Sequence, residues 1–81
     1  MPYRIYFDTN NGTMAYGYPL ACNGSLRDIE PIADKLKDGM RIVIYMTGEL
    51  EMEAVLEFER DNGRWIARPI EGTLKYLDTP G

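Results

Sequence analysis

From Leu50 to Glu59 the sequence alternates between two kinds of side chain without a break. Successive side chains of a β-strand point to opposite faces, so this pattern predicts one strand with a buried face and a solvated face. The apolar set is Leu50, Met52, Ala54, Leu56 and Phe58, and the opposite set is Glu51, Glu53, Val55, Glu57 and Glu59.

Turn residues on both sides of this strand predict a three-stranded antiparallel meander over residues 40–70. For the first hairpin we expect a three-residue loop, residues 47–49, because a two-residue loop would move the apolar side chains onto the glutamate face. For the second hairpin we expect a two-residue loop at Asn62-Gly63. The predicted pairs are Ile42 with Ala54, Ile44 with Met52, Met46 with Leu50, Asp61 with Arg64, Glu57 with Arg68 and Phe58 with Ala67.

The N-terminal segment predicts a second hairpin. Tyr3, Ile5 and Phe7 alternate with polar or amphipathic residues, and Asn11-Gly12 supplies a two-residue turn signal. Pairing across that turn sets Phe7 against Tyr16, Ile5 against Tyr18 and Tyr3 against Leu20.

One helix is predicted between the hairpin and the meander. A helix capped by Ser25 would carry Pro31 in its interior, at a cost of about 3 kcal/mol. Capping by Asp28 places Pro31 in the first turn, so we expect a helix from Asp28 to about Asp38, ended by Gly39.

These elements predict a single β-rich α+β domain over residues 1–81: an N-terminal β-hairpin, one α-helix and a three-stranded meander. Residues 73–77 fit either a short closing strand or one helical turn, and we expect the strand. A strongly twisted meander with this closing strand is the alternative architecture, a small SH3-like half-open barrel with one helix.

The sequence lacks the residues that several kinds of catalytic and metal site usually need. The chain has no histidine and one cysteine, Cys22, so the commonest general base, the partner of a Ser or Cys nucleophile and a cysteine zinc site are all missing. We therefore expect no catalytic, cofactor-binding or metal residues and no enzymatic activity. An enzyme that uses carboxylates or Cys22 is the weaker alternative.

Charge and hydropathy limit the partners. The formal net charge is −4, which disfavours binding to nucleic acid or to anionic lipid, and the sequence contains no long apolar stretch. We expect a cytoplasmic protein without a membrane segment.

The solvated strand face is the candidate interaction surface. It carries a row of glutamates, and two tyrosines, Tyr6 and Tyr45, fall opposite the apolar face in the expected registers. The candidate residues are Tyr6, Tyr45, Glu51, Glu53, Glu57 and Glu59. We expect a non-enzymatic domain that binds a protein partner. The candidates for this partner are a basic protein and a second copy of this chain. A nucleic-acid-related role, through aromatic contacts or by imitation of the DNA backbone, is the alternative.

Overall fold

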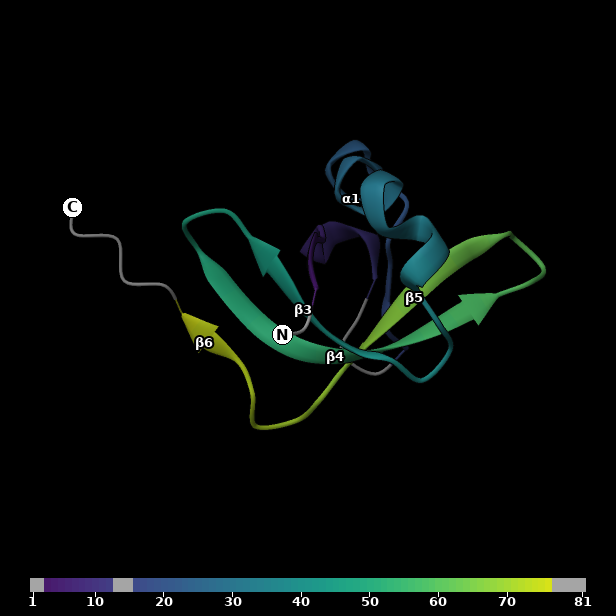
Figure 1. Cartoon of the computed structure of the whole chain (residues 1–81). Helices are drawn as coiled ribbons and strands as arrows, with labels where there is room; N and C mark the ends of the chain where they lie inside the picture. The colour runs from purple at the N-terminus through teal and green to yellow at the C-terminus, as the bar shows by residue number, and fades with distance from the viewer. Residues whose placement is uncertain (1–2, 13–15, 77–81) are drawn as a thin grey trace.

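The computed structural model describes residues 3–12 and 16–76. These residues form an α+β, β-rich domain in which one sheet curls into a half-barrel around one helix, as Figure 1 shows. The elements in chain order are β1 (Arg4–Tyr6), the 3-10 helix η1 (Thr9–Asn11), β2 (Tyr18–Pro19), α1 (Asn23–Ile29), the 3-10 helix η2 (Glu30–Lys35), β3 (Arg41–Met46), β4 (Leu50–Glu59), β5 (Arg64–Pro69) and β6 (Lys75–Tyr76).

The predicted meander is confirmed as β3, β4 and β5. Its first hairpin has the expected register, since Ile42 pairs with Ala54 and Ile44 with Met52. The alternation of β4 therefore sends its apolar side chains into the core, where Met52 and Leu56 are buried. Phe58 is the exception and is 36% exposed, because it lies beyond the end of the core.

The second hairpin differs from the prediction by two positions. Phe58 pairs with Trp65 and Glu59 with Arg64, so the loop is longer than Asn62-Gly63 alone. A shift of two residues keeps every side chain on its predicted face. It also brings the Phe58 and Trp65 rings edge to face, with their centroids 5.0 Å apart, which favours this register over the shorter loop.

The predicted N-terminal hairpin is wrong. The Asp8 side chain accepts a hydrogen bond from the Asn10 amide and begins η1, which replaces the expected two-residue turn. Strand β1 pairs in parallel with β3, while β2 pairs antiparallel with β5, giving the sheet order β1-β3-β4-β5-β2. The predicted pairs of Phe7 with Tyr16, Ile5 with Tyr18 and Tyr3 with Leu20 are therefore absent among the described strands.

Two aromatic residues of the predicted hairpin help to close the half-barrel, although the prediction pairs each of them with a different residue. The Phe7 and Tyr18 rings, which adjoin the two outermost strands of that order, lie 4.9 Å apart between centroids. Both rings are buried, so they join the two sides of the curled sheet through side chains instead of backbone hydrogen bonds.

The predicted helix start at Asp28 is also wrong. Helix α1 begins at Asn23, after Cys22, and ends at Ile29, before Pro31. The chain then continues as η2 with Pro31 in its first turn, so the proline is accommodated by a change of helix type. Gly39 does not end the helical segment as predicted, since η2 ends at Lys35 with Leu36 as its C-cap; Gly39 instead adopts a positive φ of 82° in the turn that leads to β3.

Strand β6 confirms the expected closing strand. It pairs antiparallel with β4 at Leu50 and Glu51, while Leu77 lies outside the described residues. Between β5 and β6 the Thr73 hydroxyl accepts a hydrogen bond from the Glu53 amide and donates one to the Ile70 carbonyl. These hydrogen bonds hold the segment after β5 against the edge of β4.

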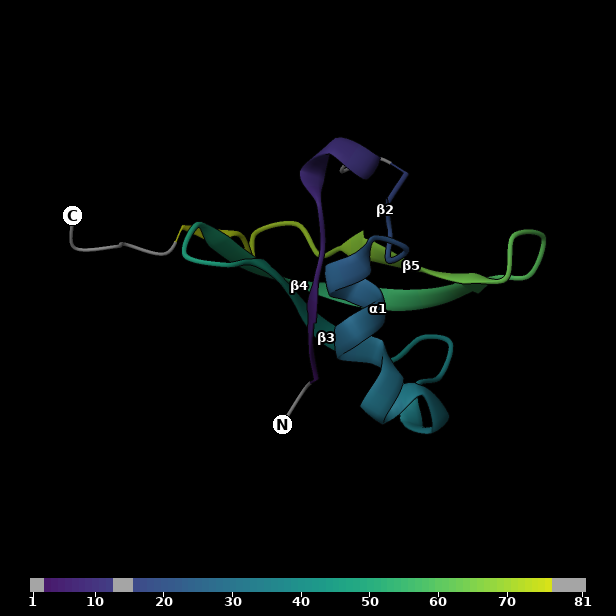
Figure 2. The same ribbon diagram turned by 90° about the horizontal axis from the view of Figure 1, so that it is seen from above.

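The core lies between α1 and the concave side of the sheet, and α1 runs alongside β1 when the molecule is seen from above (Figure 2). No helix in the described part of the chain is long and apolar enough to cross a membrane. The buried apolar side chains of the core cluster are Ile5, Phe7, Tyr18, Leu20, Ile29, Leu36, Ile42, Ile44, Met52, Ala54, Leu56 and Ala67.

Candidate functional site

The convex side of the sheet carries the candidate interaction residues, and we call it the outer face. Strands β1, β3 and β4 expose on this side the side chains that alternate with the core residues. Strand β5 completes this side, and the outer face comprises Arg4, Tyr6, Arg41, Val43, Tyr45, Glu51, Glu53, Val55, Glu57, Glu59, Arg64 and Arg68.

A pair of tyrosines lies at the β1–β3 side of this face. Tyr6 and Tyr45 are neighbours in the parallel register, and their rings meet edge to face with centroids 5.8 Å apart. The Tyr45 hydroxyl donates a 2.6 Å hydrogen bond to Asp28 of α1, and the Arg4 guanidinium lies 5.0 Å from the centre of the Tyr45 ring. The hydrogen bond to Asp28, with burial as a smaller cause, raises the pKa of the Tyr45 hydroxyl. Both rings are therefore held in place by their neighbours.

Helix α1 fixes the position of Tyr6. The Asp28 carboxylate accepts a hydrogen bond of 2.9 Å from the Tyr6 amide, and the buried Ser25 hydroxyl donates one to the Tyr6 carbonyl. The Tyr6 ring packs against Gly24, where a Cβ atom would lie 2.6 Å from Tyr6 Cδ1. Ser25 and Asp28 thus satisfy the outward backbone groups of β1 that a further strand would otherwise pair.

The glutamates of the candidate surface are all paired with arginines. Ion pairs join Arg4 to Glu51 at 2.5 Å, Arg41 to Glu53 at 3.5 Å, Arg64 to Glu59 at 2.8 Å, and Arg68 to Glu57. Hydrogen bonds, from Asn62 first and Arg64 second, lower the pKa of Glu59, and the bond to Glu57 raises the pKa of Arg68. The predicted acidic row is thus a row of mixed charge.

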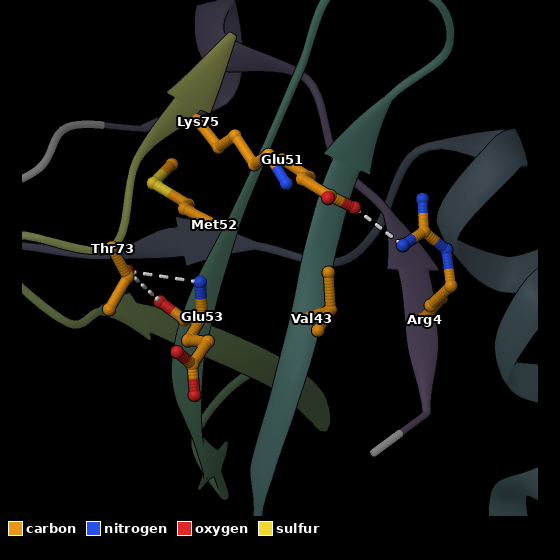
Figure 3. Close-up of a pocket in the computed structure, with 7 residues that line it drawn as sticks. All are labelled: Arg4, Val43, Glu51, Met52, Glu53, Thr73 and Lys75. Atoms are coloured by element: carbon orange, nitrogen blue, oxygen red, sulfur yellow. Dashed lines mark hydrogen bonds and ion pairs between the residues drawn. The ribbon is translucent and has the colours of Figure 1, made fainter. Parts of the chain in front are cut away.

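A hollow of about 280 Å³ lies on the outer face beside β6, and we call it the β6 hollow (Figure 3). Arg4 and Lys75 flank it from β1 and β6, and Glu51 bonds to Arg4 across β3. Its lining residues are Arg4, Val43, Glu51, Met52, Glu53, Thr73 and Lys75.

A second hollow, of about 230 Å³, lies where α1 meets the tyrosine pair, and we call it the tyrosine hollow. Two of its walls are Tyr6 and Tyr45, and the helix contributes a cation, Arg27, and an anion, Asp28. Its lining residues are Tyr6, Gly24, Arg27, Asp28, Tyr45 and Thr47.

The structure brings together only part of the predicted surface. Tyr6 and Tyr45 adjoin Glu51, which pairs with Tyr45 across β3 and β4, and Glu53 follows on the same face. The remaining predicted residues, Glu57 and Glu59, lie farther along β4, where it pairs with β5.

Sequence reasoning placed Arg68 opposite Glu57, and the two side chains do form an ion pair, but it missed the contacts of Arg4 and Arg41 and the helix residues of this site. Arg4 alternates with the core residue Ile5 and so shares a face with Tyr6, a signal that was present in the sequence. No pattern in the sequence indicates the roles of Arg27 and Asp28, because these roles depend on the position of α1 beside β1.

Cys22 and the carboxylates do not form a metal centre within residues 3–12 and 16–76, where no group of three or more potential ligands is close enough to hold an ion. The Cys22 thiol is half-buried at the start of α1, with its sulfur 3.1 Å from Ser25 Oγ.

The fold and site thus define a small α+β half-barrel domain with a mixed-charge outer face and a fixed tyrosine pair. Comparison with known proteins finds no matching family, no significantly similar curated protein and no similar solved structure.

Proposed function

We propose that this chain is a protein-binding domain whose outer face contacts the partner, with Tyr6 and Tyr45 as the anchor. The observation that carries the proposal is the fixation of the tyrosine pair by Asp28, Arg4 and Gly24 before any partner binds. Aromatic and arginine side chains dominate the energetics of protein interfaces, and rigid ones lose little conformational entropy on binding.

The composition of the outer face supports the same role. Half-buried valines, Val43 and Val55, lie between the arginine–glutamate pairs, so apolar area is framed by charged groups. A polar rim around an apolar centre is the usual anatomy of a protein interface.

The ion pairs favour a different kind of partner from the basic one expected from the sequence. A purely basic partner would have to compete with arginines for Glu51, Glu53, Glu57 and Glu59. A partner with charges of both signs can instead pair with both members of each couple. The same alternation of charge weakens the case for imitation of a DNA backbone, which is uniformly negative.

Site-directed cross-linking tests this proposal. The photoreactive residue p-benzoylphenylalanine would replace Val43 on the outer face and, as the control, exposed Arg60 in the β4–β5 loop. We expect a discrete cross-linked species from position 43 alone in cells that make the protein. A second copy of this chain in that species would identify the homodimer.

The cross-linked protein, once purified, permits a quantitative test. Tyr45→Ala should weaken its binding by a factor of ten or more, as expected for an interface anchor that contributes about 1.4 kcal/mol or more. The control is Tyr76→Ala, at an exposed tyrosine of β6 outside this face. Equal affinity of the Tyr45→Ala variant and the unmodified domain, both folded by circular dichroism, would contradict the proposal.

A further inference from the structure

We propose that the tyrosine hollow receives a single glutamate or aspartate side chain of the protein partner, with Arg27 as its charge partner. This inference rests on the proposed function and adds the chemistry of one contact. On the outer face, each of four arginines is paired with a glutamate: Arg4, Arg41, Arg64 and Arg68.

Arg27 is a cation that this pairing leaves available, and it lies beside the tyrosine pair. It is exposed, it lines the hollow, and no ion pair joins it to a carboxylate within the part of the chain that the structure describes. An arginine guanidinium binds a carboxylate through two parallel hydrogen bonds, which gives both energy and orientation.

Asp28, the anion in the same hollow, is already engaged. One of its carboxylate oxygens accepts hydrogen bonds from the Tyr6 amide and from the Tyr45 hydroxyl. Its charge still disfavours a strongly anionic guest. A phosphate group carries a charge between about −1.5 and −2, whereas a carboxylate carries one charge and matches the single guanidinium of Arg27.

The dimensions also favour one side chain. Pockets for small molecules usually enclose about 300–1,000 Å³, and the tyrosine hollow is smaller, at about 230 Å³. The Tyr6 and Tyr45 rings offer apolar walls for the methylene groups of a glutamate while Arg27 takes its carboxylate. The missing Cβ of Gly24 lets the Tyr6 ring form its wall against the helix.

Nuclear magnetic resonance titration of the full chain tests the inference. The probes are the peptide acetyl-Gly-Glu-Gly-amide, its Gln counterpart and inorganic phosphate, added at low ionic strength. We expect saturable shifts of the Arg27 Nε–H signal and of the Gly24 amide with the Glu peptide, and about tenfold weaker binding of the Gln peptide.

Two variants locate the contact. Arg27→Gln should weaken binding of the Glu peptide by about tenfold, whereas Arg60→Gln, at an exposed arginine of the β4–β5 loop, should leave it unchanged. Equal binding of the Glu and Gln peptides, tighter binding of phosphate, or no effect of Arg27→Gln would each overturn the inference.

The two proposals fail separately. Cross-linking from position 43 without any Glu-peptide shifts at Arg27 would overturn the carboxylate contact and leave the protein-binding role supported. Glu-peptide binding at Arg27 without a cross-linked partner would overturn the protein-binding role and leave Arg27 as a carboxylate-binding residue only.

Discussion

One carboxylate oxygen of Asp28, on helix α1, lies 2.9 Å from the backbone nitrogen of Tyr6, on strand β1. Ser25, one helical turn earlier, donates its hydroxyl proton to the Tyr6 carbonyl. Two side chains at i and i+3 of one helix thus occupy the hydrogen-bonding positions of a neighbouring strand. An open strand edge is a template for pairing with other chains, so this arrangement protects β1.

Removal of the Ser25 hydroxyl should destabilise the domain. Ser25→Ala leaves the part-buried Tyr6 carbonyl without its donor, and we expect the free energy of unfolding to fall by about 1–3 kcal/mol. Urea denaturation monitored by Trp65 fluorescence measures the change. The control is Thr47→Ala in an exposed turn, expected to stay within about 0.5 kcal/mol of the unmodified chain. An equal effect of both substitutions would contradict this role of Ser25.

The titration of Tyr45 should depend on Asp28. The hydrogen bond to the Asp28 carboxylate raises the pKa of the Tyr45 hydroxyl above its ordinary value, so Asp28→Asn should lower that pKa. The ¹³Cζ chemical shift of Tyr45, followed against pH, reports the titration residue by residue. A pKa that is unchanged in Asp28→Asn would show that the hydrogen bond is not its cause.

The same shift predicts a dependence of stability on pH. The pKa of Tyr45 is higher in the folded state than in the unfolded state, so its contribution to stability is complete below the unfolded pKa of about 10. The contribution disappears as the pH rises through the folded pKa. Tyr45→Phe lacks the ionisable hydroxyl and should remove this component of the alkaline loss of stability.

Gly24 should be coupled energetically to Tyr6. An alanine Cβ at position 24 would lie 2.6 Å from Tyr6 Cδ1, so Gly24→Ala forces the ring to move and should cost about 1–3 kcal/mol. The better helix propensity of alanine offsets at most about 1 kcal/mol of this cost. In a Tyr6→Ala background the clash is gone, and the same substitution should be neutral or stabilising. A double-mutant cycle in urea measures the coupling, and additivity would exclude it.

The pKa of Glu59 should rise when Asn62 is truncated. The Asn62 amide donates a 2.6 Å hydrogen bond to Glu59, and Arg64 adds a second bond at 2.8 Å, so Asn62→Ala should bring the Glu59 pKa closer to its ordinary value. Because folding depresses this pKa, the stabilisation is present above about pH 4.3 and is lost as the pH falls through the folded pKa. Carboxyl ¹³C shifts of Glu59, followed against pH in the unmodified chain and in Asn62→Ala, measure the change.

Thr73 should protect the Glu53 amide, at the edge of β4, from hydrogen exchange. Thr73→Val removes the oxygen that accepts from the Glu53 amide, and we expect that amide to exchange with deuterium about tenfold faster. Amides in the β3–β4 hairpin should keep their rates, and Thr47→Val serves as the matched control. Unchanged exchange at Glu53 would mean that β6 itself, not Thr73, protects this position.

Local patterns predicted the meander because its hairpins join neighbours in the sequence. The alternation in β4 determined which residues face the core, and the loop after Met46 was correct because a one-residue slip would have buried glutamates. The Asn11-Gly12 signal failed because the Asp8 side chain bonds to the Asn10 amide and begins a different turn. The helix start failed because Ser25 and Asp28 bond to β1 and not to the end of their own helix.

The candidate site was predicted in outline. Tyr6, Tyr45 and the glutamates share a face, as expected from period-two alternation. Three of the arginine–glutamate pairs lie within the hairpins of the meander, whereas the Arg4–Glu51 pair and the hollow beside Arg27 depend on the parallel pairing of β1 with β3 and on the placement of α1. No pattern of nearby residues encodes those long-range contacts.

The parallel pairing of Ile5 with Ile44 has a consequence for the order of folding. The hairpins of the meander close short loops, whereas β1 finds its partner only after the long segment that contains α1 has been brought back to the sheet. Closure of long loops is entropically costly and slows folding, so we expect the meander to form first and β1 to join it afterwards. Because β1 carries Arg4 and Tyr6, a partly folded chain would present the meander without the tyrosine pair, and recognition through that pair would be confined to fully folded molecules.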